Sequence, residues 1–247
     1  MASWWAALRT GVWTAPLVLA GSALFASLSL LACVVSRGGR FSYRLARAWS
    51  RLALRVAGVR VEVEGAEKIA PGSSYVLVAD HLSPLDIPCI LAHVSAQIRL
   101  LVDKKYFSIP VVGFYLRRSG HLAVSGANPR QSLEALTAAA RLIAGREISV
   151  LVFPEGGRGR GGPLPFRDGA AYLAIRAGAP IVSIALQGAG EVLPLGSLVV
   201  RKGVVRMRIG DPIPTLDLKL EDRTRLSESL RTSPGEFSPP LAGARPN

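Results

Sequence analysis

The chain of 247 residues has little cysteine and few aromatic rings. Its two cysteines, Cys33 and Cys89, exclude a disulfide-stapled scaffold, and their separation fits no metal-binding motif. Aromatic residues make up only 6% of the chain, while hydrophobic residues make up 49%. That hydrophobic content excludes intrinsic disorder, and no Gly-X-Y period is present. We therefore expect one sizeable globular domain with appendages in a reducing setting, with no metal and no disulfide framework.

Acidic residues are absent from the first 61 positions, whereas eight arginines lie within residues 1–60. The remaining 187 residues hold 22 basic and 17 acidic side chains, so more than half of the net charge of +13 lies in the first quarter of the chain. A basic segment beside an apolar one favours a membrane surface over nucleic acid as the partner. Because the basic residues cluster beside an expected membrane anchor rather than among stacking aromatic residues, we expect no nucleic-acid partner.

Residues 12–35 contain no charge, and their 24 positions reach about 36 Å as a helix, enough for a hydrocarbon core of about 30 Å. We expect residues 1–36 to form a membrane anchor. A single tilted spanning helix is the leading interpretation; the alternatives are a hairpin that dips into one leaflet, bent at Pro16 or Gly21, and a cleaved signal peptide. Seven arginines follow the segment and one precedes it, which predicts that the rest of the chain is cytoplasmic.

Residues 37–58 predict a basic amphipathic helix. Arginines recur at steps of three and four, and a neighbouring face carries Leu45, Trp49, Leu52 and Val56. Such a helix can lay its apolar face into the headgroup boundary while its guanidinium groups meet lipid phosphates, which makes it an interfacial helix. The alternative is a solvated helix packed on the globular domain.

Residues 59–231 alternate between strand and helix patterns. Strands are predicted at Val59–Val63, Tyr75–Val78, Ile98–Val102, Leu122–Val124, Ile148–Phe153 and Ile181–Leu186, with a late pair within Val199–Ile209. Helices are predicted at Pro84–Val94, Arg130–Ala144 and Gly169–Ala177. The fold class is therefore α/β, with a mixed, largely parallel central sheet flanked by helices and an N-terminal membrane-anchoring helix. The Pro-, Ser- and Gly-rich residues 232–247 predict a disordered tail.

A histidine and an aspartate lie five residues apart directly after the strand that ends at Val78. Ser83 suits a helix N-cap with Pro84 at the first helical position, so the turn returns Asp86 toward His81. A carboxylate on one imidazole nitrogen fixes the tautomer and leaves the other nitrogen to act as a general base. On these residues alone, a capping box closed by Asp86 is an equal alternative.

A glycine-rich loop follows the apolar strand that ends at Phe153. Six of the fourteen residues from Gly156 to Gly169 are glycine, and Arg158 and Arg160 add positive charge suited to phosphate. A dinucleotide-binding fingerprint is excluded, because prolines separate the loop from the next helix and no acid follows about twenty residues later.

Together these two motifs closely resemble those of the glycerolipid acyltransferases of the 1-acylglycerol-3-phosphate acyltransferase type. The resemblance rests on His-x-x-x-x-Asp followed by Phe-Pro-Glu-Gly-x-Arg. It extends over most of residues 50–215 and includes the segments 104–110, 165–170, 179–182 and 210–213 with Gly113.

The resemblance implies transfer of an acyl chain from a thioester, on CoA or acyl carrier protein, to the hydroxyl of a lysophospholipid. His81 would remove the proton of that hydroxyl and Asp86 would orient the imidazole. By the same pattern Glu155, Gly156 and Arg158 help to bind the phosphate-bearing acceptor. No serine or cysteine is placed as a covalent nucleophile, so we expect no acyl-enzyme and no cofactor beyond the acyl donor as co-substrate.

The chain departs from the family pattern at Gly126, where an arginine thought to meet the acceptor phosphate is usual. Loss of one such contact costs roughly 1.5–3 kcal/mol. Candidate replacement phosphate contacts are Arg117, Arg118, Arg130 and Lys104. Gly157 replaces the usual threonine and Ser183 stands where proline is common, and we expect His121 to be structural rather than a second base.

Three functions are therefore carried forward. The first is a membrane-bound enzyme that makes phosphatidic acid from lysophosphatidic acid for phospholipid biosynthesis, with membrane lipids, the acyl donor and the lysophospholipid as its partners. The second is an acyltransferase for another lysophospholipid or a lyso-aminolipid, which would explain Gly126. The third is a non-catalytic membrane-surface protein that binds lipids.

Overall fold

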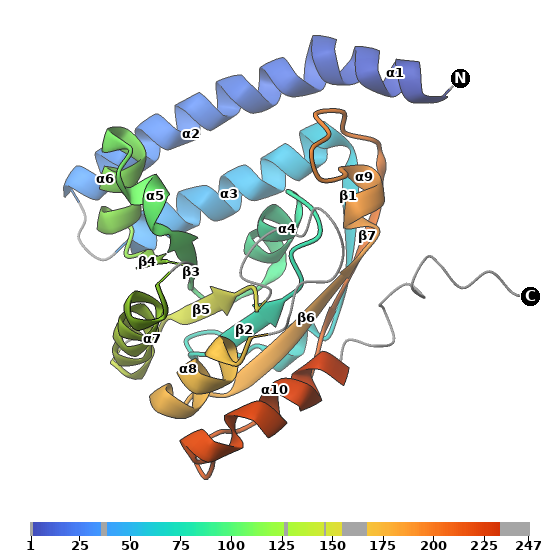
Figure 1. Ribbon diagram of the computed structural model, residues 1–247. Helices are drawn as coiled ribbons and strands as arrows, with labels where there is room; N and C mark the ends of the chain where they lie inside the picture. The colour runs from blue at the N-terminus through green and yellow to red at the C-terminus, as the bar shows by residue number, and fades with distance from the viewer. Residues whose placement is uncertain (1, 36–38, 126–127, 146, 155–166, 233–247) are drawn as a thin grey trace, which may run out of the picture.

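A computed structural model describes residues 2–35, 39–125, 128–145, 147–154 and 167–232. Its centre is a seven-stranded sheet of order β1-β7-β6-β2-β5-β3-β4, in which every neighbouring pair is parallel except β6 with β7 (Figure 1). The strands are β1 (Val59–Glu64), β2 (Val76–Ala79), β3 (Ile98–Asp103), β4 (Leu122–Val124), β5 (Ser149–Val152), β6 (Ile181–Gln187) and β7 (Gly203–Ile209). The expected mixed, largely parallel α/β sheet is confirmed.

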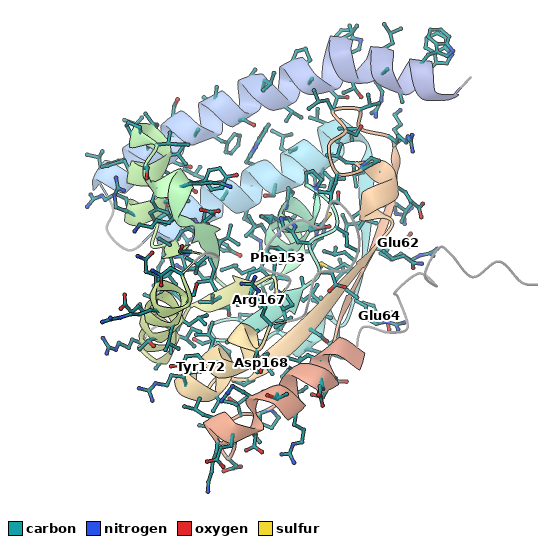
Figure 2. The ribbon with its side chains drawn as sticks, in the orientation of Figure 1. Glu62, Glu64, Phe153, Arg167, Asp168 and Tyr172 are labelled. Atoms are coloured by element: carbon teal, nitrogen blue, oxygen red, sulfur yellow. The ribbon has the colours of Figure 1, made fainter. Side chains whose placement is uncertain are left out.

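Burial explains which strands are central. All four residues of β2 and of β5 are buried, as expected of apolar runs that are covered on both faces. Edge strand β1 instead alternates, so its acidic side chains face outward. There Glu62 pairs with Arg206 (3.5 Å) and Glu64 with Arg208 (3.0 Å) across the β1–β7 ladder (Figure 2).

Helices cover both faces of the sheet. One apolar core joins β2 and β5 to α7 (Pro129–Ala144), α8 (Gly169–Ala177) and α10 (Arg223–Thr232). The opposite face packs against α3 (Arg40–Ala57), α4 (Asp86–His93) and α9 (Ala189–Val192). Apart from the N-terminal segment, the other helices described are α5 (Lys104–Phe107) and α6 (Pro110–Arg118). Short 3-10 turns lie at Ala66–Lys68 and Leu220–Asp222.

The N-terminal segment is one long helix made of α1 (Ala2–Arg9), a π-helical turn η1 (Thr10–Thr14) and α2 (Ala15–Val35). Within the described residues, Trp4–Ala32 is long and apolar enough to cross a membrane, and little of it is buried in the protein. Length and composition thus suit membrane association.

The long helix lies along α3 instead of projecting from the domain (Figure 1). The ring of Trp49 lies 5.2 Å from that of Phe25, and a Cβ on Gly21 would overlap the Trp49 ring. The helix predicted within residues 37–58 forms as α3 over Arg40–Ala57. Trp49 on its apolar face packs against α2, because Gly21 permits a close approach, whereas Leu52 on the same face stays 44% exposed.

The predicted late pair of strands is wrong. Only β7 forms, between β1 and β6, and residues 199–202 lie outside any strand. The polar groups of Val200 are used elsewhere: its carbonyl accepts from Arg9 Nη2 (2.8 Å) and Thr10 Oγ1 (3.2 Å), and its N–H donates to Thr10 Oγ1. This segment binds the N-terminal helix instead of pairing with β7.

Candidate active site

His81 follows the end of central strand β2, at the carboxyl edge of the parallel sheet, where sites of α/β proteins form. A turn over residues 83–85 then leads into α4, which begins at Asp86, two residues later than predicted. Ser83 stabilises this turn, since its Oγ accepts from the N–H of Leu85 (3.2 Å) and donates to the carbonyl of Leu193 (2.8 Å).

One buried carboxylate oxygen joins the turn to the imidazole. Oδ2 of Asp86 lies 3.2 Å from Nδ1 of His81 and accepts from the N–H of Ser83 at 2.7 Å. His81 is 8% exposed and Asp86 1%. Since an ionised carboxylate only accepts hydrogen bonds, this contact favours the tautomer with the proton on Nδ1 and the lone pair on Nε2. The bond from the Ser83 N–H and the imidazole contact thus coexist on one oxygen, but the predicted N-cap at Ser83 is wrong, because Leu85 holds that position and makes no side-chain cap bond.

Phe153, at the end of the neighbouring strand β5, stacks on the imidazole of His81 with ring centroids 4.2 Å apart and an interplanar angle of 22°. Sequence reasoning passed over this contact, although Phe153 opens the second motif. The motif residues Glu155, Gly156 and Arg158 lie outside the described residues. The two sides of that segment meet, because the N–H of Arg167 donates to the carbonyl of Pro154 (3.1 Å; Figure 2).

Two further ionisable groups lie close to Asp86. Burial, and then the charge of Asp86, raise the pKa of the Asp80 carboxyl, which sequence reasoning did not single out. The same two causes raise the pKa of the Cys89 thiol to about 12. Cys89 is free and fully buried in the apolar core beneath α3 and α4. Its thiol therefore stays protonated near neutral pH and is unsuited to nucleophilic attack.

The basic residues proposed as phosphate contacts fall into two groups. Lys104 follows β3 and Arg130 lies just beyond β4, so both leave the sheet at the same edge as His81; Arg130 is exposed and pairs with Glu134 (3.4 Å). Arg117 and Arg118 end α6, and their guanidinium groups donate to the carbonyls of Phe107 (2.9 Å) and Val34 (3.4 Å). These latter bonds hold α6 against α5 and α2, while Gly126 itself lies outside the described residues.

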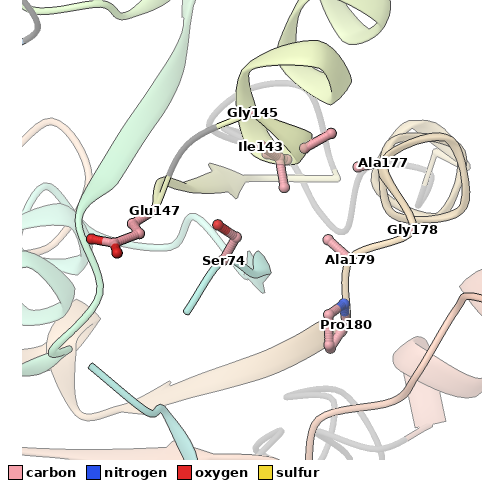
Figure 3. A pocket seen from close by; sticks show the side chains of 9 residues that line it. Ser74, Ile143, Gly145, Glu147, Ala177, Gly178, Ala179 and Pro180 are labelled. Carbon is pink, nitrogen blue, oxygen red and sulfur yellow. The ribbon is translucent and has the colours of Figure 1, made fainter. Parts of the chain in front are cut away.

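A cavity of about 530 Å³ opens at the opposite edge of the sheet (Figure 3). Ser74 and Glu147 precede β2 and β5, and residues 178–180 precede β6, so its lining belongs to the amino ends of the strands. Since the carboxyl ends carry His81, this cavity is separate from the candidate active site.

His121 lies directly before β4 with its side chain only partly exposed, and its imidazole is poorly suited to act as a second base. Burial, and then the nearby charge of Arg99, lower the pKa of its imidazole to about 3. Its Nδ1 accepts from the N–H of Leu100 (3.1 Å), which suits a neutral ring. The expected structural role agrees with this geometry.

We predict that His121 makes the fold sensitive to acid. The unfolded chain takes a proton at an ordinary pKa of 6.5 and the folded chain only near pH 3, so stability falls as the pH drops through this range. Between pH 7 and pH 5 the loss is about 2 kcal/mol. Denaturant unfolding at both pH values should show this loss, and His121→Gln, which keeps an acceptor, should reduce it. An unchanged pH dependence in the variant would contradict the assignment.

The chain belongs to the acyltransferase family, whose sequence pattern matches residues 60–187. Among its relatives are an uncharacterized acyltransferase of Schizosaccharomyces pombe (28% identical over 218 residues; 85% of this chain, 78% of the relative) and two enzymes named 1-acyl-sn-glycerol-3-phosphate acyltransferase. These are the chloroplastic enzyme of Brassica napus (29% identical; 77% and 56% covered) and the alpha enzyme of Bos taurus (28% identical; 71% and 62% covered). The chain spans less than two thirds of the length of each of these two enzymes.

The fold agrees with a solved structure. The crystal structure of the 1-acyl-sn-glycerophosphate acyltransferase PlsC from Thermotoga maritima superimposes with a TM-score of 0.72 at 22% identity. The alignment covers 99% of this chain and 100% of that one, so the N-terminal helices are included in the shared architecture.

Proposed function

We propose that this protein transfers an acyl chain from acyl-CoA or acyl carrier protein to the free hydroxyl of 1-acylglycerol-3-phosphate, giving phosphatidic acid. Family membership and the names of the relatives support the reaction class. The observation that carries the proposal is the buried contact of His81 with Asp86 at the carboxyl edge of β2.

In the proposed reaction, Nε2 of His81 takes the proton of the acceptor hydroxyl while Asp86 holds Nδ1–H. The hydroxyl oxygen bonds to the thioester carbonyl carbon, and the carbon–sulfur bond breaks as the tetrahedral intermediate collapses. The leaving thiolate then receives the proton from the imidazolium, which regenerates the neutral base. No acyl-enzyme forms, consistent with the protonated and buried thiol of Cys89.

Two contacts stabilise the positive charge that develops on His81 during the reaction. Asp86 stabilises the imidazolium through Nδ1, and the π face of Phe153 lies against the ring plane. An aromatic face attracts a cation through its quadrupole, so stacking favours the protonated ring that forms during transfer. Phe153 is thus a positioning residue for the base.

A second acceptor class is favoured by one observation. Gly126 replaces the arginine that the family pattern places against the acceptor phosphate. Lys104 and Arg130 leave the sheet at the same edge and are the best placed replacements. If neither side chain binds the acceptor phosphate, the acceptor is another lysophospholipid or a lyso-aminolipid without the glycerol phosphate.

We also propose that the protein lies on the membrane with its N-terminal helix in one leaflet and its catalytic domain on the cytoplasmic side. Arg9 Nη1 donates to the carbonyl of Ala57 (3.0 Å) near one end of the helix, and Arg118 contacts Val34 at the other. A helix attached at both ends cannot cross the bilayer without taking α3 along. The exposed arginines of α3 would oppose that, since buried charge in lipid is costly.

The dyad is tested by His81→Ala in membranes supplied with labelled acyl-CoA and lysophosphatidic acid. Because the base is lost, product formation should fall about 10²- to 10⁴-fold while protein abundance is unchanged. The control is His93→Ala, which removes an imidazole at the end of α4. The Nδ1 of His93 is hydrogen-bonded only to the carbonyl of Cys89 among the described residues, so this variant should keep its activity. Wild-type turnover by His81→Ala would refute the base assignment.

Phe153 is tested by Phe153→Leu, which keeps apolar volume but removes the π face. The turnover number kcat should fall about tenfold while KM stays constant, since the cation–π attraction that is lost acts only on the charged form of His81. Phe153→Tyr should restore kcat. The matched control Phe25→Leu breaks the ring contact with Trp49 and should leave kcat unchanged; equal losses in both leucine variants would show a merely structural role.

The acceptor is tested with purified protein, one labelled acyl donor and a panel of lyso-lipids. Lysophosphatidic acid should be the best acceptor, and Gly126→Arg should lower its KM about tenfold by adding a phosphate contact. Preference for a phosphate-free acceptor, together with no gain from Gly126→Arg, would replace the first acceptor class by the second.

A further inference from the structure

An exposed apolar surface lies on α5 and α6, outside the dyad. It consists of Tyr106, Ile109, Val111, Val112 and Phe114, which are between 38% and 61% exposed. Beyond the N-terminal helix, twelve large hydrophobic side chains are exposed in the described chain, and these five fall within nine consecutive positions. Scattered apolar residues are ordinary on protein surfaces, whereas a contiguous cluster marks a binding surface.

Basic side chains border this α5–α6 surface. Lys104, Lys105 and Arg117 are exposed beside it, and Lys105 Nζ lies 5.2 Å from the centre of the Tyr106 ring. The nearby acid, Asp103, caps α5 and pairs with Lys105 at 3.3 Å. Apolar side chains with a tyrosine and long basic residues at their rim are typical of protein surfaces at a membrane–water interface.

The fold holds these side chains outward. A Cβ on Gly113 would overlap the carbonyl oxygen of Phe107, so only glycine lets α6 approach the end of α5 this closely. Arg117 Nη1 closes the same contact by donating to the carbonyl of Phe107. These two contacts fix α6 against the end of α5, and in this arrangement the five apolar side chains stay exposed.

This surface is continuous with the face that meets the membrane. Helix α6 packs against α2, and Arg118 Nη2 donates to the carbonyl of Val34 at the end of α2 (Figure 1). On α2 itself Leu24, Leu31 and Val34 are more than half exposed. In addition, α5 begins directly after β3, so the surface lies at the edge of the sheet that carries His81.

We propose that the α5–α6 surface binds an anionic bilayer leaflet: the five apolar side chains enter the boundary between headgroups and acyl chains, and Lys104, Lys105 and Arg117 contact lipid phosphates. The proposal rests on the membrane association in the proposed function but not on catalysis. A lipid partner is favoured over a second copy of the chain because the surface continues the apolar face of α2 and is bordered by cations.

The test places a bimane fluorophore at Val111→Cys in the full-length chain, in a Cys33→Ser background; Cys89 is buried and remains. The protein is reconstituted without acyl donor in vesicles of equal parts phosphatidylcholine and phosphatidylglycerol that carry a nitroxide high on the acyl chain. Insertion to about 5–10 Å should place the label beside the nitroxide, with quenching about twofold or more above the control. The matched control is Leu216→Cys, an 80% exposed leucine between β7 and α10, and Leu24→Cys is the inserted reference.

Two results would overturn the proposal. Quenching at Val111→Cys no stronger than at Leu216→Cys would place the surface in water, and Ile109→Cys provides a second position should one labelled variant misfold. Emission that shifts with protein concentration without lipid quenching would assign the surface to a contact between copies. Replacing phosphatidylglycerol by phosphatidylcholine should weaken the quenching at Val111→Cys if the basic rim contacts lipid phosphates. Quenching is read without turnover, so it separates this proposal from the enzymatic one.

Discussion

The site depends on one carboxylate oxygen, Oδ2 of Asp86, which accepts from both the Ser83 N–H and the His81 ring. The same atom therefore closes the turn ahead of α4 and orients the imidazole, so the path of the backbone and the direction of the base are coupled. Burial strengthens this coupling, because a buried ionised carboxylate is costly unless it is hydrogen-bonded. Oδ1 has no hydrogen-bond partner among the described residues, so the stabilisation of Asp86 rests on Oδ2. Local folding and base geometry are thus not separable here.

The parallel sheet then brings further aromatic and basic side chains to the edge that carries the dyad. Strands β2, β5, β3 and β4 are consecutive neighbours, and each ends at the same edge. That edge gathers His81 from β2, Phe153 from β5, Lys104 after β3 and Arg130 beyond β4. Residues spread over about seventy positions of sequence are thereby brought to one edge of the sheet, where His81 and Phe153 are in direct contact. The strands β7 and β1, which run antiparallel to the rest, lie at the far end of the sheet, and none of these four residues comes from them.

Periodic and motif-bearing segments were predictable from sequence, whereas segments set by tertiary contacts were not. All six strands before β7 were expected, since apolar runs such as Val76–Ala79 suit a strand covered on both faces. The pairing of His81 with Asp86 followed from their spacing and the turn residues between them. Helix α6 was missed because its valines and Gly113 are poor helix formers, and its packing on α5 and α2 favours the helix instead. The failed strand near Val200 is similar, because Arg9 and Thr10, 190 residues away, take up its backbone groups.

In the proposed membrane arrangement, the N-terminal helix and the α5–α6 surface would together constrain how the domain meets a bilayer. A domain that is attached only through a helix lying in one leaflet can still rotate about the axis of that helix. The α5–α6 surface lies beside that axis, and Arg118 joins it to the end of α2. Contact of both the N-terminal helix and the α5–α6 surface with the bilayer would prevent this rotation and determine which side of the sheet faces the lipid. Since α5 starts where β3 ends, the side held against the leaflet is the one that carries the dyad. An acceptor could then reach His81 by lateral diffusion, without the desolvation cost that leaving the bilayer imposes on a long acyl chain.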